Sequence, residues 1–368
     1  MRIVQVLGTS AGGTGRHVAG LAAGLVEAGH EVVVAAPPGE LKRFGVAHSG
    51  ARPVPLAVST RPSRADAQAV RVLGAVTAQA DIVHAHGARV GALAAVALRR
   101  STVPLITTLH NATPEGAASR VIHAGLERIV ARRSTIVLGV SRDLVARQRA
   151  LGARDVALAV VAAPDFGEVR HDRDHMRRTF GLADHVALVV SVGRLAAQKD
   201  LTGLIDATLL AATDGVALLT VVAGDGPLRP QLQAHIDATG APVRLLGHRS
   251  DIADLLSAAD VVASSALWEG QPVWLQEALH VGAAIVATDA GGTADVVGQA
   301  AVLVPVSDPR SLAAALADVI RHGTLRDDLR SQATERSAEL PTTRDATAAA
   351  LETYRRALVD GSSATGRR

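Results

Sequence analysis

Short apolar runs, rich in β-branched residues, alternate with longer alanine-rich stretches from one end of the chain to the other. A run that is apolar throughout is typical of a strand buried on both faces of a parallel sheet, and the longer stretches have helical spacing. The expected strands of the first half are residues 3–7, 31–35, 81–84, 105–109, 136–139 and 157–161. Those of the second half are residues 187–192, 216–223, 243–246, 261–263, 284–287 and 301–304.

This alternation predicts an α/β protein with doubly wound parallel sheets. The pattern stops at residues 162–174, a polar stretch that contains Pro164 and Gly167, and then starts again, so we expect a linker there. A chain of 368 residues is also longer than one hydrophobic core usually supports. We therefore expect two similar domains in series, residues 1–165 and 166–343, followed by a helix at 344–360.

Composition narrows the class of protein. Aromatic residues make up only 2% of the chain, so platforms for stacking single-stranded nucleic acid are scarce and we expect no nucleic-acid partner. Cysteine is absent, which rules out disulfides and thiolate chemistry. No run of about 18 uncharged apolar residues occurs, and residues 1–8 have the pattern of a strand and a glycine loop rather than of a signal peptide. These features predict a cytoplasmic protein.

The formal net charge of +3 conceals an asymmetry. Residues 1–165 carry 19 Lys and Arg against 10 Asp and Glu, whereas the rest of the chain is net acidic. A basic first half suits an anionic substrate or a membrane surface, although uneven solvated charge explains it equally well. Within it, residues 119–133 place four arginines among apolar residues. This pattern fits either an ordinary amphipathic surface helix or a helix that docks on anionic lipid.

The strongest candidate chemistry follows the expected strand 261–263, because open parallel sheets bind ligands at the carboxyl ends of their strands. The segment 269–277 contains Glu269, Gly270, Gln271, Pro272, Val273 and Glu277. Pro272 suits the first turn of a helix, whose free N–H groups and dipole favour a phosphate. The two carboxylates can accept hydrogen bonds from paired hydroxyls, one set on a sugar and the other on a ribose. A helix start with incidental acidic residues is the alternative.

Two other strand ends suit a diphosphate. Gly193, Arg194 and Lys199 follow the strand 187–192, where the arginine offers a planar fork and the lysine a mobile point charge. Gly12 and Gly13 belong to the loop after the first strand, and glycines there let the backbone approach a phosphate closely. That loop lacks the dinucleotide fingerprint and the Walker lysine, so it is weak evidence by itself. Surface cations at a helix start are the alternative for the second segment.

The order of these segments resembles the family-4 glycosyltransferases, which are retaining enzymes of the GT-B fold. The resemblance covers nearly the whole chain, and the matching segments are residues 12–13, 81–87, 107–110, 193–199, 224–227, 246–247 and 269–277. The two glutamates keep the family's spacing of seven intervening residues. The resemblance implies two Rossmann-like domains facing a central cleft. The first domain would bind the acceptor and the second the donor, and the last helix would cross back to the first domain.

The resemblance also implies roles for individual residues. Arg194 and Lys199 would hold the donor diphosphate, Glu277 the ribose hydroxyls, and Glu269 the donor sugar. His110 would contact a sugar hydroxyl or the reacting face, and it completes the expected catalytic set of His110, Glu269, Arg194 and Lys199. The other expected donor contacts are Gly12, Gly13, Gly193, Gly224, Gly247, His248, Gly270, Gln271, Pro272 and Val273, with Arg249 as a second candidate neighbour of the base.

Three segments depart from the family pattern or imitate a different site. Residues 163–167 replace the usual junction sequence, and Gln271 stands where an apolar residue is common, which leaves the identity of the sugar open. The acidic residues at 172 and 174 imitate a metal-binding pair, but they fall in the expected linker, so we interpret them as solvated charge. The chain has 14 histidines and no H-E-x-x-H pattern, so we expect no metal. We expect His84 to be structural, and leave His86 and His17 open.

The expected activity is the transfer of a sugar from a nucleoside diphosphate, UDP or GDP, to an unidentified lipid, glycan or small-molecule acceptor. A front-face, metal-independent attack with retention of configuration is the expected mechanism, and no cofactor is expected. The alternatives are a nucleotide-sugar epimerase or phosphorylase of the same fold, and a non-enzymatic protein that binds sugar nucleotides. A phosphorylase also needs a pyridoxal lysine, and the chain has only Lys42 and Lys199.

Overall fold

The computed structural model describes residues 1–10, 12–58, 63–110, 117–163 and 167–365. The chain forms two compact units. Unit 1 contains Met1–Pro164 together with the C-terminal Pro341–Arg368, and unit 2 contains Asp165–Leu340. The junction sequence that departs from the family pattern includes residues 164–166, which lie outside the described residues.

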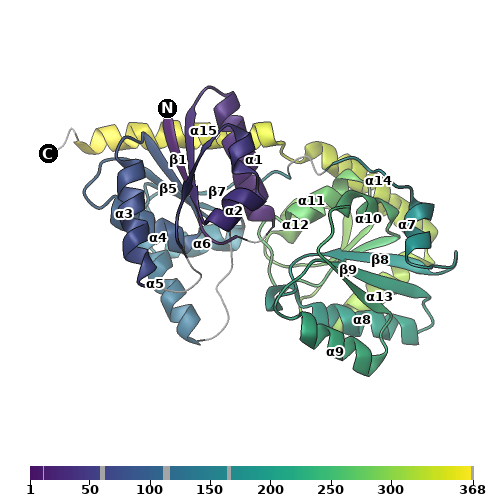
Figure 1. Cartoon of the computed structure of the whole chain (residues 1–368). Coiled ribbons are helices and arrows are strands. Elements are labelled where there is room, and N and C mark those ends of the chain that lie inside the picture. Colours follow the sequence, from purple (N-terminus) through teal and green to yellow (C-terminus); the bar gives the residue numbers. More distant parts are fainter. Residues whose placement is uncertain (11, 59–62, 111–116, 164–166, 366–368) are drawn as a thin grey trace. The chain divides into compact units, whose positions relative to one another are not determined.

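Unit 1 is a parallel sheet with helices on both faces (Figure 1). Its strands are β1 (Arg2–Leu7), β2 (Glu31–Ala36), β3 (Arg52–Pro55), β4 (Ile82–His86), β5 (Leu105–Leu109), β6 (Ile136–Gly139) and β7 (Val156–Leu158). Its helices are α1 (Gly13–Glu27), α2 (Pro38–Arg43), α3 (Ala65–Thr77), α4 (Ala88–Ala97), α5 (Ala117–Arg133), α6 (Arg142–Ala150) and α15 (Thr343–Thr365), with a 3₁₀ turn η1 (Val46–Ser49).

The sheet of unit 1 has the order β3-β2-β1-β4-β5-β6-β7. The chain reverses its direction of travel across the sheet between β1 and β4, which makes their carboxyl ends the switch point where such sheets bind ligands. Alternate residues of a strand share a face. Val4, Val6 and Val83 lie on the face that packs against Leu73 of α3 and Ala94 of α4. Helices α1 and α15 cover the other face (Figure 1).

Unit 2 repeats this architecture with six parallel strands in the order β10-β9-β8-β11-β12-β13. They are β8 (Ala187–Val192), β9 (Leu218–Ala223), β10 (Val243–Gly247), β11 (Val261–Ser264), β12 (Ile285–Thr288) and β13 (Ala301–Val304). The helices are α7 (Arg173–Thr179), α8 (Leu201–Thr213), α9 (Arg229–Thr239), α10 (Ile252–Ala258), α11 (Val273–His280), α12 (Thr293–Val297), α13 (Pro309–Arg321) and α14 (Gly323–Glu339), with a 3₁₀ turn η2 (Ala197–Lys199).

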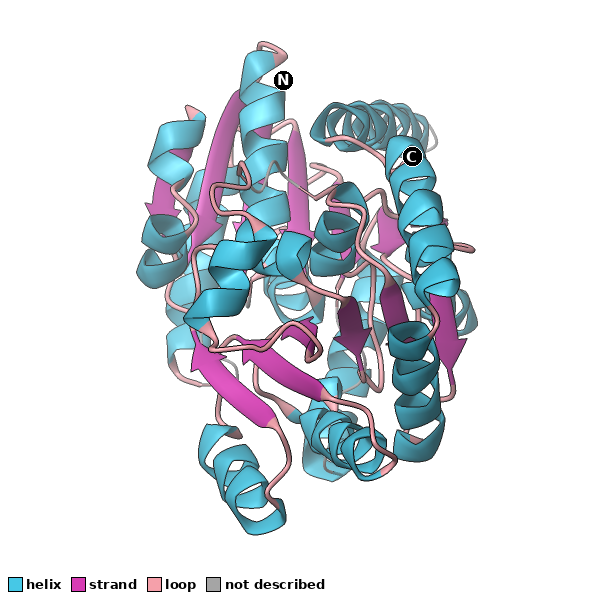
Figure 2. Ribbon diagram, turned by 90° about the vertical axis from the view of Figure 1, so that its right-hand side faces the viewer, coloured by secondary structure: helices cyan, strands magenta, loops and turns pink. Residues whose placement is uncertain are grey.

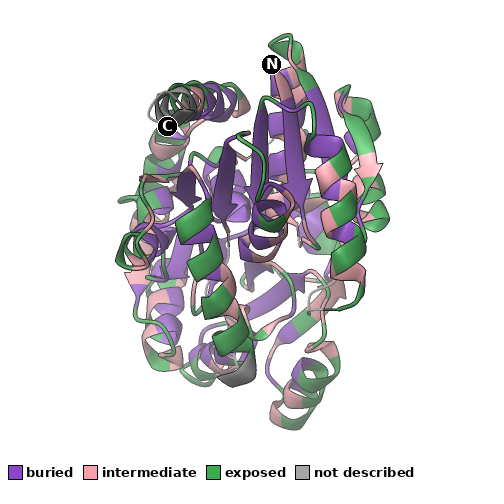
Figure 3. Cartoon of the chain, turned by 90° about the vertical axis from the view of Figure 1, so that its left-hand side faces the viewer, coloured by how far each residue is buried: buried purple, intermediate pink, exposed green. Residues whose placement is uncertain are grey.

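The sheet of unit 2 is apolar on both faces, as the continuous apolar runs of the sequence predict. Val189 belongs to the core that includes Leu204 of α8 and Leu316 of α13. Its neighbour Val190 faces the opposite core, which includes Leu275 of α11. The ribbon views show strands lying between layers of helices, and the central strands of each unit are buried (Figures 2 and 3). These observations confirm the predicted α/β class with doubly wound parallel sheets.

Strand β3 is not predicted by the apolar pattern. Its sequence is Arg-Pro-Val-Pro, and two prolines in four residues indicate a turn rather than a strand. The strand pairs only with β2, at the edge of the sheet, where a proline nitrogen leaves no ladder hydrogen bond unmade. At the opposite edge β7 ends at Leu158, whereas the pattern predicted a strand over 157–161.

Residues 172–174 do not lie in a linker, although Asp172 and Asp174 are exposed to solvent as predicted. Helix α7 begins at Arg173, and the Asp172 side chain caps it by accepting a hydrogen bond from the backbone N–H of His175 at 2.7 Å. The guanidinium of Arg173 lies 2.6 Å from Asp260, a buried carboxylate that also pairs with Arg177. The charged residues therefore hold the start of unit 2 onto its sheet. The last helix also differs from the expectation, because it spans Thr343–Thr365 rather than 344–360.

Among the helices that the structure describes, none has the length and apolar content that crossing a bilayer requires.

Candidate active site

Three of the predicted glycines lie together at the carboxyl ends of the adjacent strands β8, β9 and β10. The N–H of Gly224 donates to the carbonyl of Gly247 at 2.8 Å, and the N–H of Gly193 donates to Ala223 at 2.9 Å. Gly224 has a φ of 143°, and a Cβ there would lie 1.8 Å from the carbonyl oxygen of Gly193. No side chain fits this approach, so the strand ends present bare backbone of the kind that can approach a phosphate closely.

The loop after β8 is fastened to the loop after β11. The amide of Gln198 donates to the carbonyl of Trp268 at 2.7 Å, and the N–H of Leu267 donates to the carbonyl of Gln198 at 2.8 Å. The hydroxyl of Ser265 donates to the carbonyl of Lys199 at 2.8 Å. These bonds fix the backbone before and at Lys199, so its side chain leaves from a defined position.

Lys199 and Glu269 form an ion pair between their Nζ and Oε1 atoms. The lysine side chain is 18% exposed and the glutamate side chain 7%, so the pair lies where water screens the two charges only partly. The structure thus brings the predicted diphosphate-binding lysine and the predicted sugar-binding acid into contact. Arg194 lies in the same loop with an exposed side chain, and no described residue forms a side-chain hydrogen bond with its guanidinium.

Helix α11 starts at Val273, and Pro272 stands at its N-cap rather than inside the first turn, where the sequence predicted it. The loop after β12 holds the segment in front of the helix, because the N–H of Gly292 donates to the carbonyl of Glu269 at 2.9 Å. Glu277 is 1% exposed in the second turn of the helix. Of the other predicted residues here, Gly270 is buried and Gln271 is half-buried.

His248 and Arg249 line a hollow of about 640 Å³ beyond the end of β10. Glu168, Arg170 and Asp251 also contribute to its wall, so the lining is polar. The guanidinium of Arg249 donates to Asp251 at 2.7 Å and through a second bond. This pairing raises the pKa of Arg249 and lowers the pKa of Asp251. Arg249 is therefore engaged by a carboxylate, whereas His248 is exposed.

The remaining predicted residues belong to unit 1. Gly12 is the N-cap of α1 with a φ of 60°, and Gly13 is the first residue of that helix. Residue 11 of the same loop lies outside the described residues. His110 directly follows β5 and is half-buried. Its ring lies 6.1 Å from that of His17 in α1, so the first turns of α1 and the end of β5 meet at the same edge of the sheet.

A cluster of buried polar side chains surrounds His110, and we call it the histidine cluster. It consists of Gln5, His17, His84, His86, Thr108, His110 and Tyr354. His86 Nδ1 lies 3.2 Å from His110 Nε2, and His86 Nε2 lies 2.5 Å from the Gln5 side-chain oxygen. Through Tyr354 the cluster includes the C-terminal helix α15.

Burial depresses the pKa of each histidine in the cluster, because a charged imidazolium is costly away from water. It lowers the pKa of His17 to about 4 and, together with the neighbouring His17, the pKa of His84 to about 3. The pKa values of His86 and His110 also lie well below the usual range, through burial and the proximity of the other rings. All four imidazoles are therefore neutral at pH 7.

Two family models together cover most of the chain. Residues 12–164 match the glycosyl transferase 4-like domain, and residues 172–336 match glycosyl transferases group 1. D-inositol 3-phosphate glycosyltransferase of Nocardioides sp. is 30% identical over 314 residues, which cover 75% of this chain and 67% of that protein. The chain belongs to the family-4 glycosyltransferases.

A second relative and a solved structure are also similar to this glycosyltransferase. Phosphatidyl-myo-inositol mannosyltransferase of Mycolicibacterium smegmatis is 29% identical over 344 residues, which cover 88% of this chain and 85% of that protein. The crystal structure of HepE from Anabaena in complex with UDP has a TM-score of 0.80 at 18% identity, over 96% of this chain and 99% of that one. The likeness to HepE shows that the glycosyltransferase has the GT-B fold.

Within the described part of the glycosyltransferase, no group of three or more His, Asp or Glu side chains is arranged to hold a metal ion. The histidine cluster is not an exception, because most of its ring nitrogens are engaged in hydrogen bonds with each other, with Gln5, with Thr108 or with Tyr354.

The sequence did not identify Gln198 as a residue that fastens the loop of Lys199, nor Gln5 and Tyr354 as members of the histidine cluster of this glycosyltransferase. Two signals pointed to the histidine cluster: a glutamine in the otherwise apolar run 3–7, and histidines at alternate positions of one strand, 84 and 86. Tyr354 is the only tyrosine of the chain and is fully buried. Their connection needed the fold, because Gln5 and Tyr354 are 349 residues apart.

Proposed function

We propose that this glycosyltransferase transfers a sugar from a nucleoside diphosphate sugar to an acceptor hydroxyl, with retention of configuration and without a metal ion. The carrying observation is the ion pair of Lys199 and Glu269 beside the bare glycine backbone of unit 2, with Arg194 exposed in the loop that carries Lys199. Cations and open N–H groups suit a diphosphate, and an adjacent carboxylate suits sugar hydroxyls. HepE, which shares the fold, has been crystallised with UDP-glucose.

The proposed chemistry relies on stabilising the leaving group. The bond between the anomeric carbon and the diphosphate oxygen breaks, and its electron pair leaves with the diphosphate. The acceptor oxygen bonds to the same face of the carbon, and its proton passes to the departing diphosphate. Negative charge therefore grows where Arg194 and Lys199 would lie, and preorganised donors at such a position lower the barrier. The remaining contribution is the positioning of donor and acceptor.

In this proposal, different elements of unit 2 bind different parts of the donor. Glu277, on the second turn of α11, would accept hydrogen bonds from the ribose hydroxyls. Glu269 with the backbone of residues 270–273 would hold the sugar. His248 would neighbour the base, since it lines the polar hollow beyond β10. In unit 1, Gly12 and Gly13 would approach the donor diphosphate, and His110 would contact a sugar hydroxyl or the reacting face.

A panel of donors tests the proposal. Thermal unfolding is measured with UDP-, GDP- and ADP-sugars, because a ligand that binds the native state stabilises it by mass action, by about 2.7 kcal/mol at 100 times its Kd. We expect one nucleotide to raise the Tm, and its sugar to appear in a product whose anomeric configuration by ¹H NMR matches that of the donor. An inverted product overturns the retaining mechanism. Binding with no transfer to any lipid, glycan or alcohol favours a binding protein instead.

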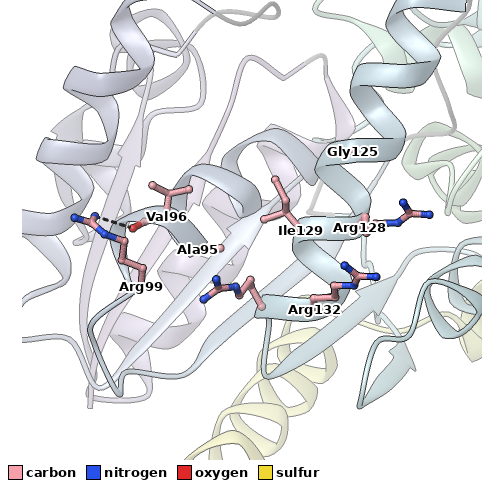
Figure 4. A pocket seen from close by; sticks show the side chains of 8 residues that line it. Ala95, Val96, Arg99, Gly125, Arg128, Ile129 and Arg132 are labelled. Carbon is pink, nitrogen blue, oxygen red and sulfur yellow. Dashed lines mark hydrogen bonds between the residues drawn. The ribbon is translucent and has the colours of Figure 1, made fainter.

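The acceptor side of the proposal includes contact with an anionic membrane surface. Helices α4 and α5 border a groove of about 490 Å³ in unit 1. Figure 4 shows the guanidinium groups of Arg99, Arg128 and Arg132 spread around the apolar side chains of Val96 and Ile129. Val96 is 43% and Ile129 39% exposed. Apolar residues ringed by arginines match a bilayer interface with phosphate headgroups.

Sedimentation with vesicles tests this contact. We expect binding to vesicles of anionic phospholipid that weakens with salt, and no binding to neutral vesicles. Arg128→Glu with Arg132→Glu should weaken binding about tenfold or more, since each cation near the surface contributes about 1 kcal/mol. The matched control reverses Arg43 and Arg52, two exposed arginines on α2 and β3. Equal loss in both double variants would show a general charge effect and remove the groove from the proposal.

A further inference from the structure

A stripe of polar side chains crosses the sheet of unit 1. Gln5 of β1 pairs in register with His84 of β4, and His86 of β4 pairs with Thr108 of β5. Because alternate residues share a face, all four side chains and His110 lie on the face covered by α1 and α15. Buried polar groups cost free energy unless they are hydrogen-bonded. The stripe therefore depends on its hydrogen bonds, unlike the apolar side chains of the surrounding core.

The hydrogen bonds of the stripe form one connected path. The side-chain amide of Gln5 donates to the hydroxyl of Tyr354 at 3.0 Å. The hydroxyl proton of Tyr354 is then directed to His84 Nδ1, 2.7 Å away. His84 is neutral, so its remaining proton is on Nε2 and is donated to the Thr108 hydroxyl at 2.7 Å.

The other branch of the path leads to His110. The side-chain oxygen of Gln5 can only accept, so His86 carries its proton on Nε2 and donates it at 2.5 Å. In a neutral ring the other nitrogen then has a lone pair, and His86 Nδ1 accepts from His110 Nε2 at 3.2 Å. His110 is left with a lone pair on Nδ1, and no described residue forms a hydrogen bond with that atom.

We propose that Tyr354, Gln5 and His86 are positioning residues that hold His110 in the tautomer with its proton on Nε2, so that Nδ1 faces the substrate as a hydrogen-bond acceptor. Tyr354 orients the Gln5 amide, Gln5 orients His86, and His86 orients His110. This inference rests on the proposed function, in which His110 meets the donor sugar or the acceptor.

The proposal also names the class of group that His110 receives. A neutral imidazole nitrogen with a lone pair accepts a hydrogen bond from a donor, so its partner is a hydroxyl of the sugar or the acceptor. A carboxylate or phosphate oxygen cannot donate to it, and an anion would face that lone pair unfavourably. Tyr354, which is fully buried in α15, makes the C-terminal helix part of this specificity.

Nitrogen NMR of the histidine rings tests the tautomer without any substrate. Protein labelled with ¹⁵N-histidine is examined by long-range ¹H–¹⁵N correlation at pH 7, and the signals of His110 are assigned from their loss in His110→Asn. We expect a protonated Nε2 and an unprotonated Nδ1. In Gln5→Glu a carboxylate next to His86 favours the doubly protonated ring. His86 Nδ1 then donates to His110, whose proton must move to Nδ1. A wild-type His110 protonated on Nδ1, or one unchanged in Gln5→Glu, overturns the assignment.

Kinetics of the same proteins test the positioning role. With His86→Phe, His110 loses its anchor, and we expect kcat to fall by about 10-fold to 10²-fold while KM for the nucleotide donor stays the same. The matched control is Thr107→Val, which removes a buried hydroxyl that bonds Ser134 at 2.8 Å on the opposite face of β5. The control should keep wild-type kcat and the His110 tautomer. Equal losses in both variants, or a normal kcat in His86→Phe, would contradict the positioning role.

The NMR and kinetic experiments distinguish failure of the His110 tautomer assignment from failure of the proposed function. If the wild-type protein transfers no sugar but His110 has the expected tautomer, the proposed function fails and the path of hydrogen bonds stands. If transfer occurs and the tautomer is absent, the path is wrong and the proposed function stands.

Discussion

Lys199 and Glu269 are bound to each other in the structure, although the proposed reaction gives them different partners. A lysine ammonium has three N–H donors and a single glutamate oxygen engages one of them, so two remain for diphosphate oxygens. The ion pair also fixes the position of a flexible side chain, which lowers the entropy cost of using it. The pair is thus a device for keeping a mobile cation in the place where charge develops.

The first prediction concerns this lysine. Lys199→Ala should lower turnover by about 10²-fold to 10³-fold, as the loss of one preorganised donor does, because the leaving diphosphate loses its compensating charge. The matched control is Lys42→Ala, since Lys42 is the only other lysine of the chain and is exposed on α2. Steady-state rates are compared per folded protein, because Glu269 also loses its partner. A near-normal rate and donor affinity in Lys199→Ala would refute the assignment.

At the residue scale, the sequence predicted where candidate side chains lie along the fold better than it predicted which side chains they contact. It identified Glu269, Lys199 and Gly224 because each follows a recognisable strand in a familiar order. It could not show that Lys199 bonds Glu269, which is 70 residues away, because such a contact depends on how two strand-end loops fold together. The histidine cluster was missed as a unit for the same reason. The sequence assigned His110 a catalytic role and His84 a structural one, and it left His17 and His86 open. It could not connect them until β1, β4, β5 and α15 were placed in one fold.

At the scale of elements, α15 is fastened to unit 1 by more than Tyr354. It packs against α1, where Gly20 and Gly24 lie one turn apart on the same side of the helix. A Cβ on Gly24 would lie 2.3 Å from the Thr347 hydroxyl, whereas a Cβ on Gly20 would come no closer than 3.5 Å to Thr343. The close approach of the two helices is therefore set by Gly24.

The second prediction compares these two glycines. Gly20→Ala should raise the free energy of unfolding by about 0.5–1 kcal/mol, since alanine favours a helix over glycine and fits the space. Gly24→Ala has the same gain in helix propensity but forces Thr347 out of its place, so it should give no gain or a loss. Urea unfolding of both variants measures the difference. Equal stabilisation by the two changes would show that α1 and α15 do not pack as closely as described.

Elements were predictable where one physical rule acted alone. The buried strands inside the sheets are continuous apolar runs, and their predicted bounds coincide with those of the structure at β5, β6 and β8. Prediction failed where tertiary placement overrode a local signal. The prolines of β3 are tolerated because the strand lies at an edge, and the charges at 172–174 form a helix start because buried Asp260 draws Arg173 onto the sheet.

At the scale of the whole molecule, the two units differ in the kind of ionisable side chain whose pKa is shifted by folding. His17, His84, His86 and His110 all lie in unit 1 with pKa values lowered by burial. The unfolded chain binds their protons below about pH 6.5, so this stability is present above that pH and is lost on acidification. In unit 2 the pKa values of Asp251 and Asp254 are lowered from 3.8, so their contribution is lost only at lower pH.

The third prediction follows from this difference: acid should unfold unit 1 before unit 2. Below about pH 6.5 the unfolded chain binds protons that the buried histidines of the native cluster do not, so acidification lowers the stability of unit 1 before the lowered aspartates of unit 2 begin to titrate. Both tryptophans, Trp268 and Trp274, lie in unit 2, and their fluorescence reports on it. Between pH 6 and pH 4 far-UV circular dichroism should fall while tryptophan emission stays native. His17→Phe should move the first transition to lower pH, because His17 contributes one such proton. Simultaneous loss of both signals in the wild type, or an unmoved transition in the variant, would contradict the neutral cluster on which the positioning of His110 depends.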